Sequence, residues 1–408
     1  MKIAVIGSGI SGLSSAYYLS KKFKVDLYEK ENYFGGHSYT YNIKKKEQII
    51  PVDLGFIVFN KLTYPNLINF FEELDVPYEK SNMSFAVSVQ DKDLEYGGSG
   101  INALFADKKN IFNLKFLNMI REIIQFYKSA PKLHKENLAD ETLGNYLKRS
   151  KLSEYFIQYH IIPMVAAIWS MPIDKAMNLP FELFLKFFLN HGLFKFKKRP
   201  QWYTVKDRSK NYVNKVLSRI SGEIYKNYEI QQIERSENNV RIKIGNEYLD
   251  YDHVILATHA DQSLNMLSDC TEDEKKILGN FQYVSNFAVL HTDSNLMPKR
   301  KSTWSSWNSI TNHGKTCITY WLNKLQNLKC KENFFLTLNP ILPIDQKTII
   351  KKVNFTHPYF NSETVNNQKN LDLLQGKKRT WYCGSYFGYG FHEDGIKSTI
   401  NFLDKFKL

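Results

Sequence analysis

The chain has 408 residues, of which 43% are hydrophobic and 24% charged, and its formal net charge is +14. This length exceeds one typical core, so we expect two interleaved domains, and no apolar run reaches the roughly 18 residues of a membrane span. The basic residues are nearly all lysine, whereas sites that read nucleic-acid bases favour arginine, so we expect no nucleic-acid partner.

Cysteine usage indicates the cellular setting. Cys270, Cys317, Cys330 and Cys383 have no metal-site spacing and form no framework of close pairs, so we expect no metal and a reducing, cytoplasmic environment. The apolar start ends at Gly7 without a cleavage-like site, which argues against an export signal. Peripheral contact with the inner face of a membrane is compatible with this setting, and the sequence leaves the oligomeric state open.

The first half of the chain begins with a strand, a helix and a strand, and then becomes largely helical. Hydrophobic periodicity predicts strands over residues 2–6 and 25–29, a helix over 10–21, and further helices within 67–74, 112–127 and 181–196. The stretch from about residue 60 to 160 is therefore expected to be mainly helical.

The second half returns to strands. Alternation and short apolar runs predict strands over residues 224–233, 240–244, 254–257, 287–291, 317–321, 334–338 and 381–383, and a last helix opens at about Gly395.

A glycine-rich turn joins the first predicted strand to the first predicted helix. It consists of Gly7, Ser8, Gly9, Ile10, Ser11 and Gly12. In this context the first glycine permits the tight turn, the second lets the backbone approach a pyrophosphate, and the third lets the helix pack on the strand. The helix N-terminus then presents free N–H groups to the phosphates. The spacing alone is a weak signal, so the flanking elements decide its meaning.

Glu29 ends the second predicted strand, where an acid hydrogen-bonds the ribose hydroxyls of a bound dinucleotide. A carboxylate at this point also disfavours a 2′-phosphate. The alternative is a solvated glutamate after a strand. Together with the glycine turn, Glu29 favours a dinucleotide site.

The continuation of the chain distinguishes FAD from NAD. After Glu29 and Lys30 come Gly35, Gly36, His37 and Ser38. Here the sequence resembles the flavoprotein superfamily of amine oxidases, protoporphyrinogen oxidase and phytoene desaturases, in which a Gly-Gly-Arg loop lies on the FAD phosphates. The resemblance implies FAD beside Lys30, Gly36, His37 and Ser38. His37 stands where many members have arginine, so we expect less neutralisation of phosphate charge there, with the N–H groups of Gly36 and His37 still available. A flexible turn is the alternative for the glycine pair.

Other segments extend the resemblance over the whole chain. Val52-Asp53-Leu54-Gly55-Phe56 is similar to the superfamily's segment beside the isoalloxazine, which implies contacts from Gly55 and Phe56. Glu229-Ile230 is similar to its second adenine-contacting unit, which implies that the backbone of Ile230 hydrogen-bonds adenine.

Within the superfamily the chain most resembles a bacterial group of predicted NAD/FAD-binding proteins. The strings that carry this likeness are residues 55–60, Ala166-Ala167-Ile168-Trp169-Ser170, Arg199-Pro200-Gln201-Trp202 and residues 388–395. That group tends to have Gly-Gly-Ser where this chain has Asp207-Arg208-Ser209, so we expect a different local loop geometry.

The C-terminal unit also resembles the superfamily. Gly384 follows a strand, and the last helix opens near Gly395 and Ile396. In the superfamily this helix points its N-terminus at the N1–C2 edge of the flavin, where negative charge in the reduced form is stabilised. The resemblance therefore implies that all three residues contact FAD. His392 is the nearest titratable residue, and we predict that it assists proton movement as a catalytic residue. A loop histidine that only packs or is solvated is the alternative.

These observations predict an α/β fold that resembles the amine oxidases. A Rossmann-type FAD-binding domain is assigned to residues 1–60, 205–270 and 378–408, and an interleaved α+β substrate domain to residues 61–204 and 271–377.

The predicted function is an FAD-dependent oxidoreductase that oxidises, desaturates or isomerises an organic, lipid-like small molecule by hydride transfer to flavin N5. One alternative is an amine oxidase with Tyr386 or Tyr389 in an aromatic cage. A nicotinamide-only dehydrogenase leaves the second glycine pair unexplained, and the intact glycine turn argues against a non-catalytic lipid-binding protein of the same fold. We expect FAD to be non-covalent, although a link through His37 or Cys383 stays open.

Residues 181–199 are the predicted point of membrane contact. Phenylalanines and leucines there accompany Lys186, Lys195, Lys197, Lys198 and Arg199, a pattern that suits the boundary between anionic headgroups and acyl chains. The alternative is a core helix with a solvated basic end. The lipid-like substrate, a fatty-acyl chain among the options, is expected partly on this ground.

Overall fold

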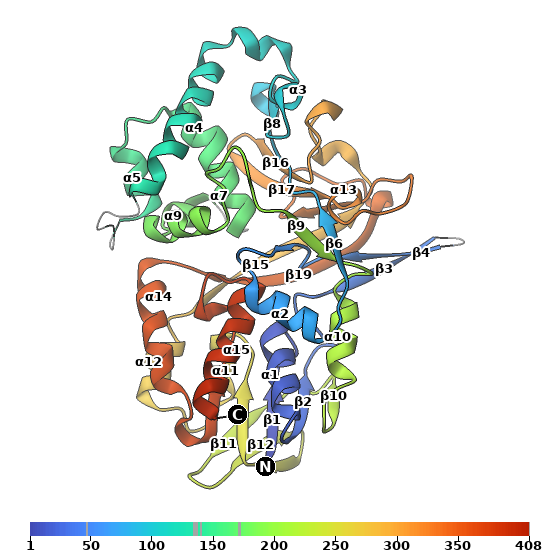
Figure 1. Cartoon of the computed structure of the whole chain (residues 1–408), viewed down its shortest axis with the longest axis vertical. Helices are drawn as coiled ribbons and strands as arrows, with labels where there is room; N and C mark the ends of the chain where they lie inside the picture. The colour runs from blue at the N-terminus through green and yellow to red at the C-terminus, as the bar shows by residue number, and fades with distance from the viewer. Residues whose placement is uncertain (46–47, 134–137, 139–140, 170–172, 408) are drawn as a thin grey trace.

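The chain folds into two lobes of different construction, and both termini lie in the same lobe (Figure 1). The computed structural model describes residues 1–45, 48–133, 138, 141–169 and 173–407, and for Ile173 and Asp174 it describes the backbone only. Ser170 of the tryptophan motif lies outside these residues.

The lobe that holds the termini is built on a five-stranded parallel sheet. Its order is β10-β2-β1-β14-β20, with bounds β1 (Lys2–Ile6), β2 (Lys24–Glu29), β10 (Ile224–Lys226), β14 (His253–Leu256) and β20 (Thr380–Tyr382). The central strands are buried on both faces, which explains their continuous apolar sequences. The strands fall within the three ranges assigned above to one domain; the boundaries themselves stay a prediction.

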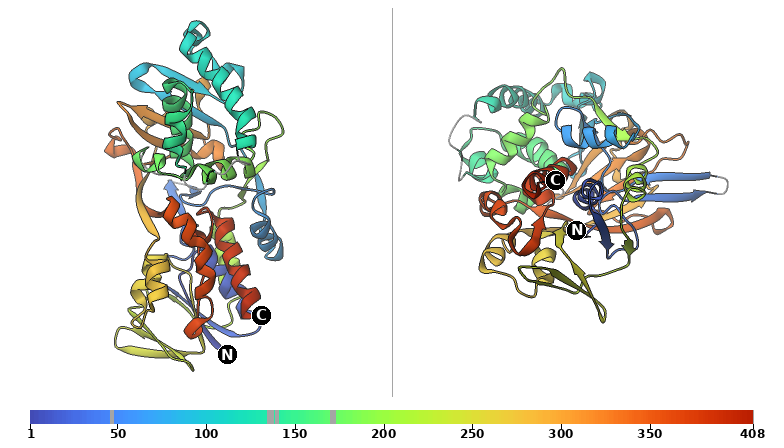
Figure 2. Two further views of the ribbon diagram at one scale, coloured as in Figure 1. Left: turned by 90° about the vertical axis from the view of Figure 1, so that its left-hand side faces the viewer. Right: turned by 60° about the horizontal axis from the view of Figure 1, so that its bottom comes forward.

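Helices cover the two faces of this sheet, and a small antiparallel sheet flanks it. The helices are α1 (Ile10–Ser20), α2 (Pro65–Glu73), α10 (Lys210–Leu217), α11 (Ala260–Met266), α12 (Glu272–Leu278), α14 (Ser362–Asn367) and α15 (His392–Phe406). The small sheet has the order β11 (Gln232–Arg235), β12 (Val240–Ile244) and β13 (Glu247–Tyr251). Figure 2 shows α1 and α15 packed beside each other over the sheet.

A seven-stranded mixed sheet forms the base of the other lobe. Its order is β19 (Ile349–Tyr359), β15 (Gln282–His291), β18 (Phe335–Leu338), β17 (Lys315–Trp321), β16 (Trp307–Asn312), β7 (Phe85–Val89) and β8 (Leu94–Gly97). The long strands β15 and β19 run from this lobe towards the parallel sheet (Figure 1).

A helical layer packs on the mixed sheet and carries most of the aromatic core. It comprises α3 (Ile101–Leu104), α4 (Leu114–Leu133), α5 (Leu143–Arg149), α6 (Glu154–Phe156), a π-helical turn (Ile157–Ile161), α7 (Ile162–Trp169), α8 (Ile173–Met177) and α9 (Phe181–Asn190). The remaining named elements are β3 (Thr40–Lys45), β4 (Gln48–Asp53), β5 (Phe59–Asn60), β6 (Tyr78–Ser81), β9 (Trp202–Val205) and α13 (Leu322–Leu325).

The structure corrects the expectation of membrane contact through residues 181–199. The aromatic face of α9 is turned into the protein: Phe184, Phe187, Phe188 and Phe194 are all buried in the helical core. Of the phenylalanines in this segment only Phe196 is exposed. The segment is therefore a core helix with a solvated basic end, because burial of its aromatic side removes the apolar surface that a bilayer would need.

Candidate functional site

Two parallel helices begin side by side at the junction of the lobes. Gly395 of α15 lies against Ile10 and Ser11 of α1, so closely that an added Cβ would stand 2.7 Å from Ile10 Cγ2. Further along, Thr399 Oγ1 donates to the Ser11 carbonyl at 3.0 Å and accepts from Ser14 Oγ at 3.0 Å. Since the contacts advance together along both helices, the helices run in the same direction (Figure 1). Two adjacent helix N-termini place their positive dipole ends together, which favours an anionic ligand.

The glycine turn before α1 has the stereochemistry of a phosphate-binding loop. Gly7 has φ +95°, a conformation that L side chains rarely adopt, and a Cβ on Gly12 would stand 1.8 Å from the Gly7 carbonyl oxygen. By contrast, a Cβ on Gly9 would meet no atom within 4 Å. Gly7 and Gly12 are thus required by the fold itself. Gly9 faces open space, so a ligand can approach the protein backbone closely there.

Glu29 is buried at the end of β2 and holds the glycine turn in place. Its Oε2 accepts from the Ser8 N–H at 3.0 Å and from Ser8 Oγ at 2.5 Å, and its Oε1 accepts from the Glu31 N–H at 2.9 Å. Ser8 Oγ in turn accepts from the Gly35 N–H at 3.0 Å. A carboxylate has about four acceptor positions, so Glu29 keeps capacity for a ribose hydroxyl. The alternative of a solvated surface glutamate is wrong.

The loop after β2 returns to the glycine turn. A Cβ on Gly36 would stand 3.1 Å from Gly9 Cα, so the second glycine pair lies against the first. His37 follows, and its buried Nε2 has no hydrogen-bond partner among the described residues. Burial lowers the pKa of His37 to about 4, so the ring is neutral near pH 7. His37 therefore supplies no charge where the superfamily has arginine, but it offers an unpaired polar atom to a ligand.

Four histidines from distant parts of the chain surround this region. The rings of His37 and His357, on β19, lie 4.9 Å apart, and His259 at the N-terminus of α11 stacks on Tyr283 at 4.0 Å. Burial lowers the pKa of His259 and of His357 to about 3, and mutual repulsion with His37 adds to both shifts. The fourth is His392. Imidazoles held neutral donate and accept hydrogen bonds without adding charge.

His392, the predicted catalytic residue, occupies the first turn of α15. Its ring stacks on Phe56 with centroids 3.7 Å apart and planes 12° apart. Its Nε2 lies 2.9 Å from Ser38 Oγ and 3.4 Å from the Tyr212 hydroxyl, and Ser38 and Tyr212 are also hydrogen-bonded to each other. Burial lowers its pKa well below the ordinary value. The ring is not freely solvated, because it packs on Phe56 and is held by these hydrogen bonds, and its catalytic role stays a prediction.

The acids next to His392 have structural roles. Asp394 Oδ2 accepts from the Phe391 N–H at 2.9 Å, which caps α15, and burial raises the pKa of Asp394 to about 7. Glu393 accepts from the N–H groups of Asn66 and Leu67 at 3.1 and 3.0 Å, so it caps α2 from another part of the chain. The contacts of Glu393 therefore hold the start of α15 against the start of α2.

The other predicted cofactor residues are distributed around the same point. Gly55 and Phe56 follow the His37 loop, with the Phe56 N–H donating to the His37 carbonyl at 2.7 Å. Gly384 donates from its N–H to Ser398 Oγ at 2.9 Å, and Ile396 is fully buried behind α1. Ile230 is buried just beyond β10, the neighbour of Glu29 in the sheet, whereas Lys30 is exposed.

Asp53, which no sequence pattern marked as a site residue, lies buried under this site. Its carboxylate accepts from Thr40 Oγ1 at 2.6 Å and from the N–H and Oγ of Ser209 at 2.9 and 2.7 Å. Burial raises the pKa of Asp53 to about 6, partly offset by these hydrogen bonds. Asp207 and Arg208, before Ser209, have φ +62° and +76°. Both residues adopt the left-handed conformation that glycine favours, and the expected difference in loop geometry from the resembled group stays a prediction.

Aromatic residues gather between α9 and the start of α15. Phe187 lies 4.9 Å from both Trp169 and Phe391 and 3.9 Å from His191, measured between ring centroids. Tyr389 is 6.3 Å from the same ring. Tyr386 packs elsewhere, fully buried against Phe281, so it does not join this group. Of the two tyrosines considered for an aromatic cage, Tyr389 belongs to the group around Phe187 and Tyr386 does not.

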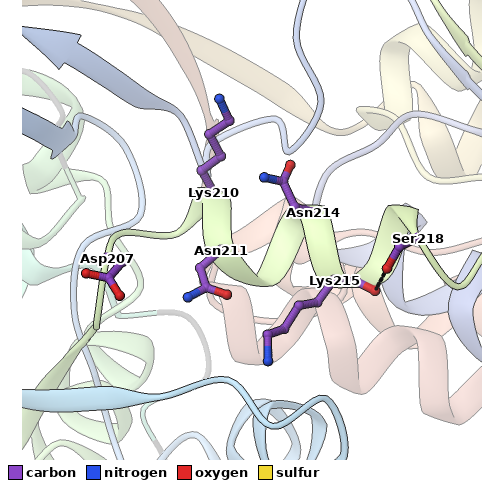
Figure 3. A pocket seen from close by; sticks show the side chains of 6 residues that line it. All are labelled: Asp207, Lys210, Asn211, Asn214, Lys215 and Ser218. Carbon is purple, nitrogen blue, oxygen red and sulfur yellow. Dashed lines mark hydrogen bonds between the residues drawn. The ribbon is translucent and has the colours of Figure 1, made fainter. Parts of the chain in front are cut away.

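A hollow of about 400 Å³ lies along α10 and is separate from these residues. It is lined by Asp207, Lys210, Asn211, Asn214, Lys215 and Ser218, all from one helix and its approach (Figure 3). None of the predicted site residues lines it. Among the described residues there is also no group of His, Cys, Asp and Glu side chains that could hold a metal ion, and no helix long and apolar enough to cross a membrane.

Comparison with known proteins agrees with the architecture. Residues 5–74 match the sequence model of the NAD(P)-binding Rossmann-like domain. The whole chain superimposes on a fatty acid isomerase from P. acnes, with 14% identity, 98% of that chain covered and a TM-score of 0.69. It superimposes on cyclohexylamine oxidase from Brevibacterium oxydans with 12% identity, 99% coverage and a TM-score of 0.68. The chain has an amine-oxidase-like fold.

A third full-length match is a candidate protoporphyrinogen oxidase from Exiguobacterium, with 13% identity, 98% of that chain covered and a TM-score of 0.68. No curated protein matches the sequence. The predicted fold class is confirmed: a Rossmann-type domain is combined with a mixed-sheet substrate domain, as in the amine oxidases. At these identities the likeness establishes the fold and leaves the substrate to be argued from the site.

Proposed function

We propose that this amine-oxidase-like protein binds FAD non-covalently and catalyses oxidation, desaturation or isomerisation of an apolar, lipid-like molecule. The observation that carries the proposal is the pair of parallel helix N-termini at α1 and α15, with open space beside Gly9 where an added Cβ would meet no atom within 4 Å. Such a concentration of positive dipole ends is unfavourable without a negative ligand, and a dinucleotide pyrophosphate fits it.

The residues present fit FAD in both halves. The turn at Gly9 would hold the pyrophosphate, Glu29 the ribose, and the backbone of Ile230 the adenine. The start of α15, at Gly395 and Ile396, would face the pyrimidine edge of the flavin. When bound, the flavin would supply a hydride acceptor at N5.

A non-covalent cofactor is favoured by the state of Cys383. Its thiol is buried between α1 and α15, 3.5 Å from Ser15 Oγ, and burial raises its pKa to about 12. A protonated thiol in the core is a poor nucleophile. His37 is closer to the proposed site, and its unpaired Nε2 is better suited to hydrogen-bonding the cofactor than to carrying charge.

His392, Ser38 and Tyr212 would move a proton to or from the substrate side. Their three polar atoms are within hydrogen-bond distance of one another, so a proton lost at one end can be replaced from the other. Because His392 is neutral, it acts as an acceptor or relay and not as a stored acid.

The apolar substrate class is supported by the aromatic group around Phe187, which offers large apolar rings and few charges next to the start of α15. The similarity to a fatty acid isomerase is in accord with this. An amine substrate is the second candidate, favoured by Tyr389 beside these rings and by the similarity to cyclohexylamine oxidase.

The test of the substrate class uses the flavin-loaded protein under anaerobic conditions. A panel of unsaturated fatty acids and a panel of simple amines are mixed with it, while the flavin spectrum and the double-bond positions in the recovered lipids are followed. We expect bleaching or double-bond rearrangement with fatty acids, slowed by His392→Gln at unchanged flavin content. Bleaching by amines alone would overturn the lipid assignment, and inertness to both panels would contradict the substrate classes proposed.

A further inference from the structure

Exposed apolar side chains are concentrated at the end of the molecule opposite both termini. Phe112 is 86% exposed, Leu114 81% and Ile101 77%. With Ile111 and Leu117 they form a group, here called the apolar tip, on α3, the 3₁₀ turn Lys108–Phe112 and the first turns of α4. Figure 1 places these segments at the far end of the lobe that contains the mixed sheet and its helical layer, here called the helical lobe. Exposed apolar residues are common singly, but five between residues 101 and 117 at one end of the molecule indicate an interaction surface.

The exposure follows from the register of α4 and is not a packing defect. The inner side of α4 places Phe116, Met119 and Phe126 in the helical core. Leu114, Leu117 and Ile124 lie on the opposite side of α4, at spacings of three and seven residues. All three side chains are exposed to solvent. An amphipathic helix would ordinarily present polar residues on that side.

The exposed charged side chains next to the apolar tip, between residues 101 and 132, are all positive. They are Lys108, Lys109, Lys115, Arg121, Lys128 and Lys132. The two carboxylates in this stretch are buried and engaged. Asp107 accepts from Arg300 at 2.8 Å, and Glu122 accepts from the Ser153 N–H at 2.8 Å. The outward field at this end is therefore positive.

A surface hollow of about 600 Å³ begins beside the apolar tip. Leu114 and Lys115 line one side, and Tyr155 and Tyr159, with rings 4.7 Å apart, line the other. Glu154 also lines it, so the hollow is not uniformly basic. Apolar, aromatic and lysine side chains together suit an amphiphile whose headgroup is anionic.

We propose that the apolar tip docks on the surface of an anionic lipid bilayer. Phe112, Leu114 and Ile111 would enter the boundary between headgroups and acyl chains, while the surrounding lysines contact the headgroups. Charge complementarity selects this occupant: a second copy of the chain would bring the same positive face against itself and be repelled. This inference is independent of the proposed cofactor, because the apolar tip lies in the helical lobe, away from α1 and α15 (Figure 1).

The test is cosedimentation of the purified full-length holoprotein with vesicles of phosphatidylcholine, with and without phosphatidylglycerol. We expect binding to the anionic vesicles that weakens with salt. The double variant Phe112→Ser with Leu114→Ser should lower the bound fraction about tenfold, because two apolar insertions are lost. Lys108→Glu with Lys109→Glu should lower it similarly on anionic vesicles only.

Two matched controls make the result specific. Leu62→Ser with Leu373→Ser removes apolar side chains that are 63% and 59% exposed elsewhere, and Lys195→Glu with Lys197→Glu changes charge beside buried α9. Both should bind vesicles like the wild type, and all four variants should keep their thermal midpoint and flavin content. Absence of wild-type binding, or equal loss in a control, would overturn the proposal. So would a concentration-dependent dimer that the Phe112 and Leu114 changes abolish without any vesicle binding, which would assign the apolar tip to self-association.

Discussion

At the scale of single residues, the three glycines of the first turn have separable roles. Gly12 has no room for a side chain, since a Cβ would overlap the Gly7 carbonyl oxygen at 1.8 Å, whereas a Cβ at Gly9 meets nothing within 4 Å. Gly9 also has φ −64°, which any residue adopts. We therefore predict that Gly9→Val removes most bound FAD but leaves the thermal midpoint of the flavin-free protein nearly unchanged, while Gly12→Ala destabilises the fold by about 2 kcal/mol or more.

Thermal unfolding and flavin content, measured on both variants and the wild type, check this pair. Lys22 is exposed just after the end of α1 and away from the turn, so Lys22→Ala is the control and should change neither quantity. Full flavin occupancy in Gly9→Val would contradict the assignment of the pyrophosphate to this turn.

Residue roles were predictable where a local pattern dictates backbone geometry. The glycine spacing and the acid at the strand end identify Gly7, Gly12 and Glu29 without any tertiary information. His357 and Asp53 were not assigned roles, because their importance arises from neighbours about 320 and 156 residues away, His37 and Ser209. His259 follows a strand of the parallel sheet, and the rule that ligands gather at carboxyl ends of such strands offered a signal for it.

At the scale of elements, the contact between α1 and α15 is the feature on which the site depends. Gly395 allows the close approach, because a Cβ there would stand 2.7 and 2.8 Å from Ile10 Cγ2 and Ser11 Oγ. We predict that Gly395→Val pushes the start of α15 away from α1 and weakens FAD binding at least tenfold, with a smaller loss of stability, because the rest of α15 remains packed.

Fluorescence titration of the apoprotein with FAD measures this effect. The substitution is a more specific test of this contact than deletion of the residues from Gly384 onward, because the deletion also removes Ile396, Phe402 and Leu403 from the core. Lys397→Ala, on the exposed side of the same turn, is the control and should bind FAD like the wild type. Unchanged affinity in Gly395→Val would show that the start of α15 does not contact the cofactor.

The opening and closing elements were predicted closely, but the middle of the chain was not. β1, α1 and β2 match the expected bounds within one residue, since each has a clear period and a glycine or acid at its end. Within the stretch expected to be helical, β7 and β8 are almost wholly buried and show no alternation, so their period is hidden. The pairing of β7 with β16 joins segments more than 200 residues apart, which no local pattern reveals. The helix expected over 181–196 ends at Asn190, because Gly192 follows with φ +64°.

At the scale of the whole molecule, histidines whose pKa is lowered control the dependence of stability on pH. Burial lowers the pKa of six of them to about 3 or 4: His37, His160, His191, His259, His291 and His357. Below pH 6.5 the unfolded chain protonates these rings while the folded chain does not until about pH 4. Their contribution to stability is therefore lost as pH falls from 6.5, by up to about 1.4 kcal/mol per ring and pH unit.

Two acids whose pKa is raised act in the opposite direction. The pKa of Asp53 is raised to about 6 and that of Asp394 to about 7, so the folded chain holds their protons in a range where the unfolded chain has lost them. Their effect favours the folded state as pH falls from 7 to 4, but two groups do not offset six. We predict a lower denaturant midpoint at pH 5.5 than at pH 7.5, with a net uptake of protons on unfolding at pH 5.5.

Denaturant titrations at the two pH values, with calorimetry in buffers of different ionisation enthalpy, check this prediction. His357→Gln should reduce the difference between the two midpoints, because it removes one of the rings whose pKa is lowered. Higher stability at pH 5.5 would mean that the buried rings are charged in the folded protein.

The central claim is that FAD occupies the junction of α1 and α15, and the absorbance of the purified protein before and after denaturation tests it most directly. We predict a yellow protein with flavin bands near one flavin per chain, released into the filtrate when the chain is unfolded. The Gly9→Val variant should be nearly colourless, with the thermal midpoint of the flavin-free wild type. A colourless wild-type protein that takes up no FAD on reconstitution, or flavin that stays attached to the denatured chain, would contradict the account.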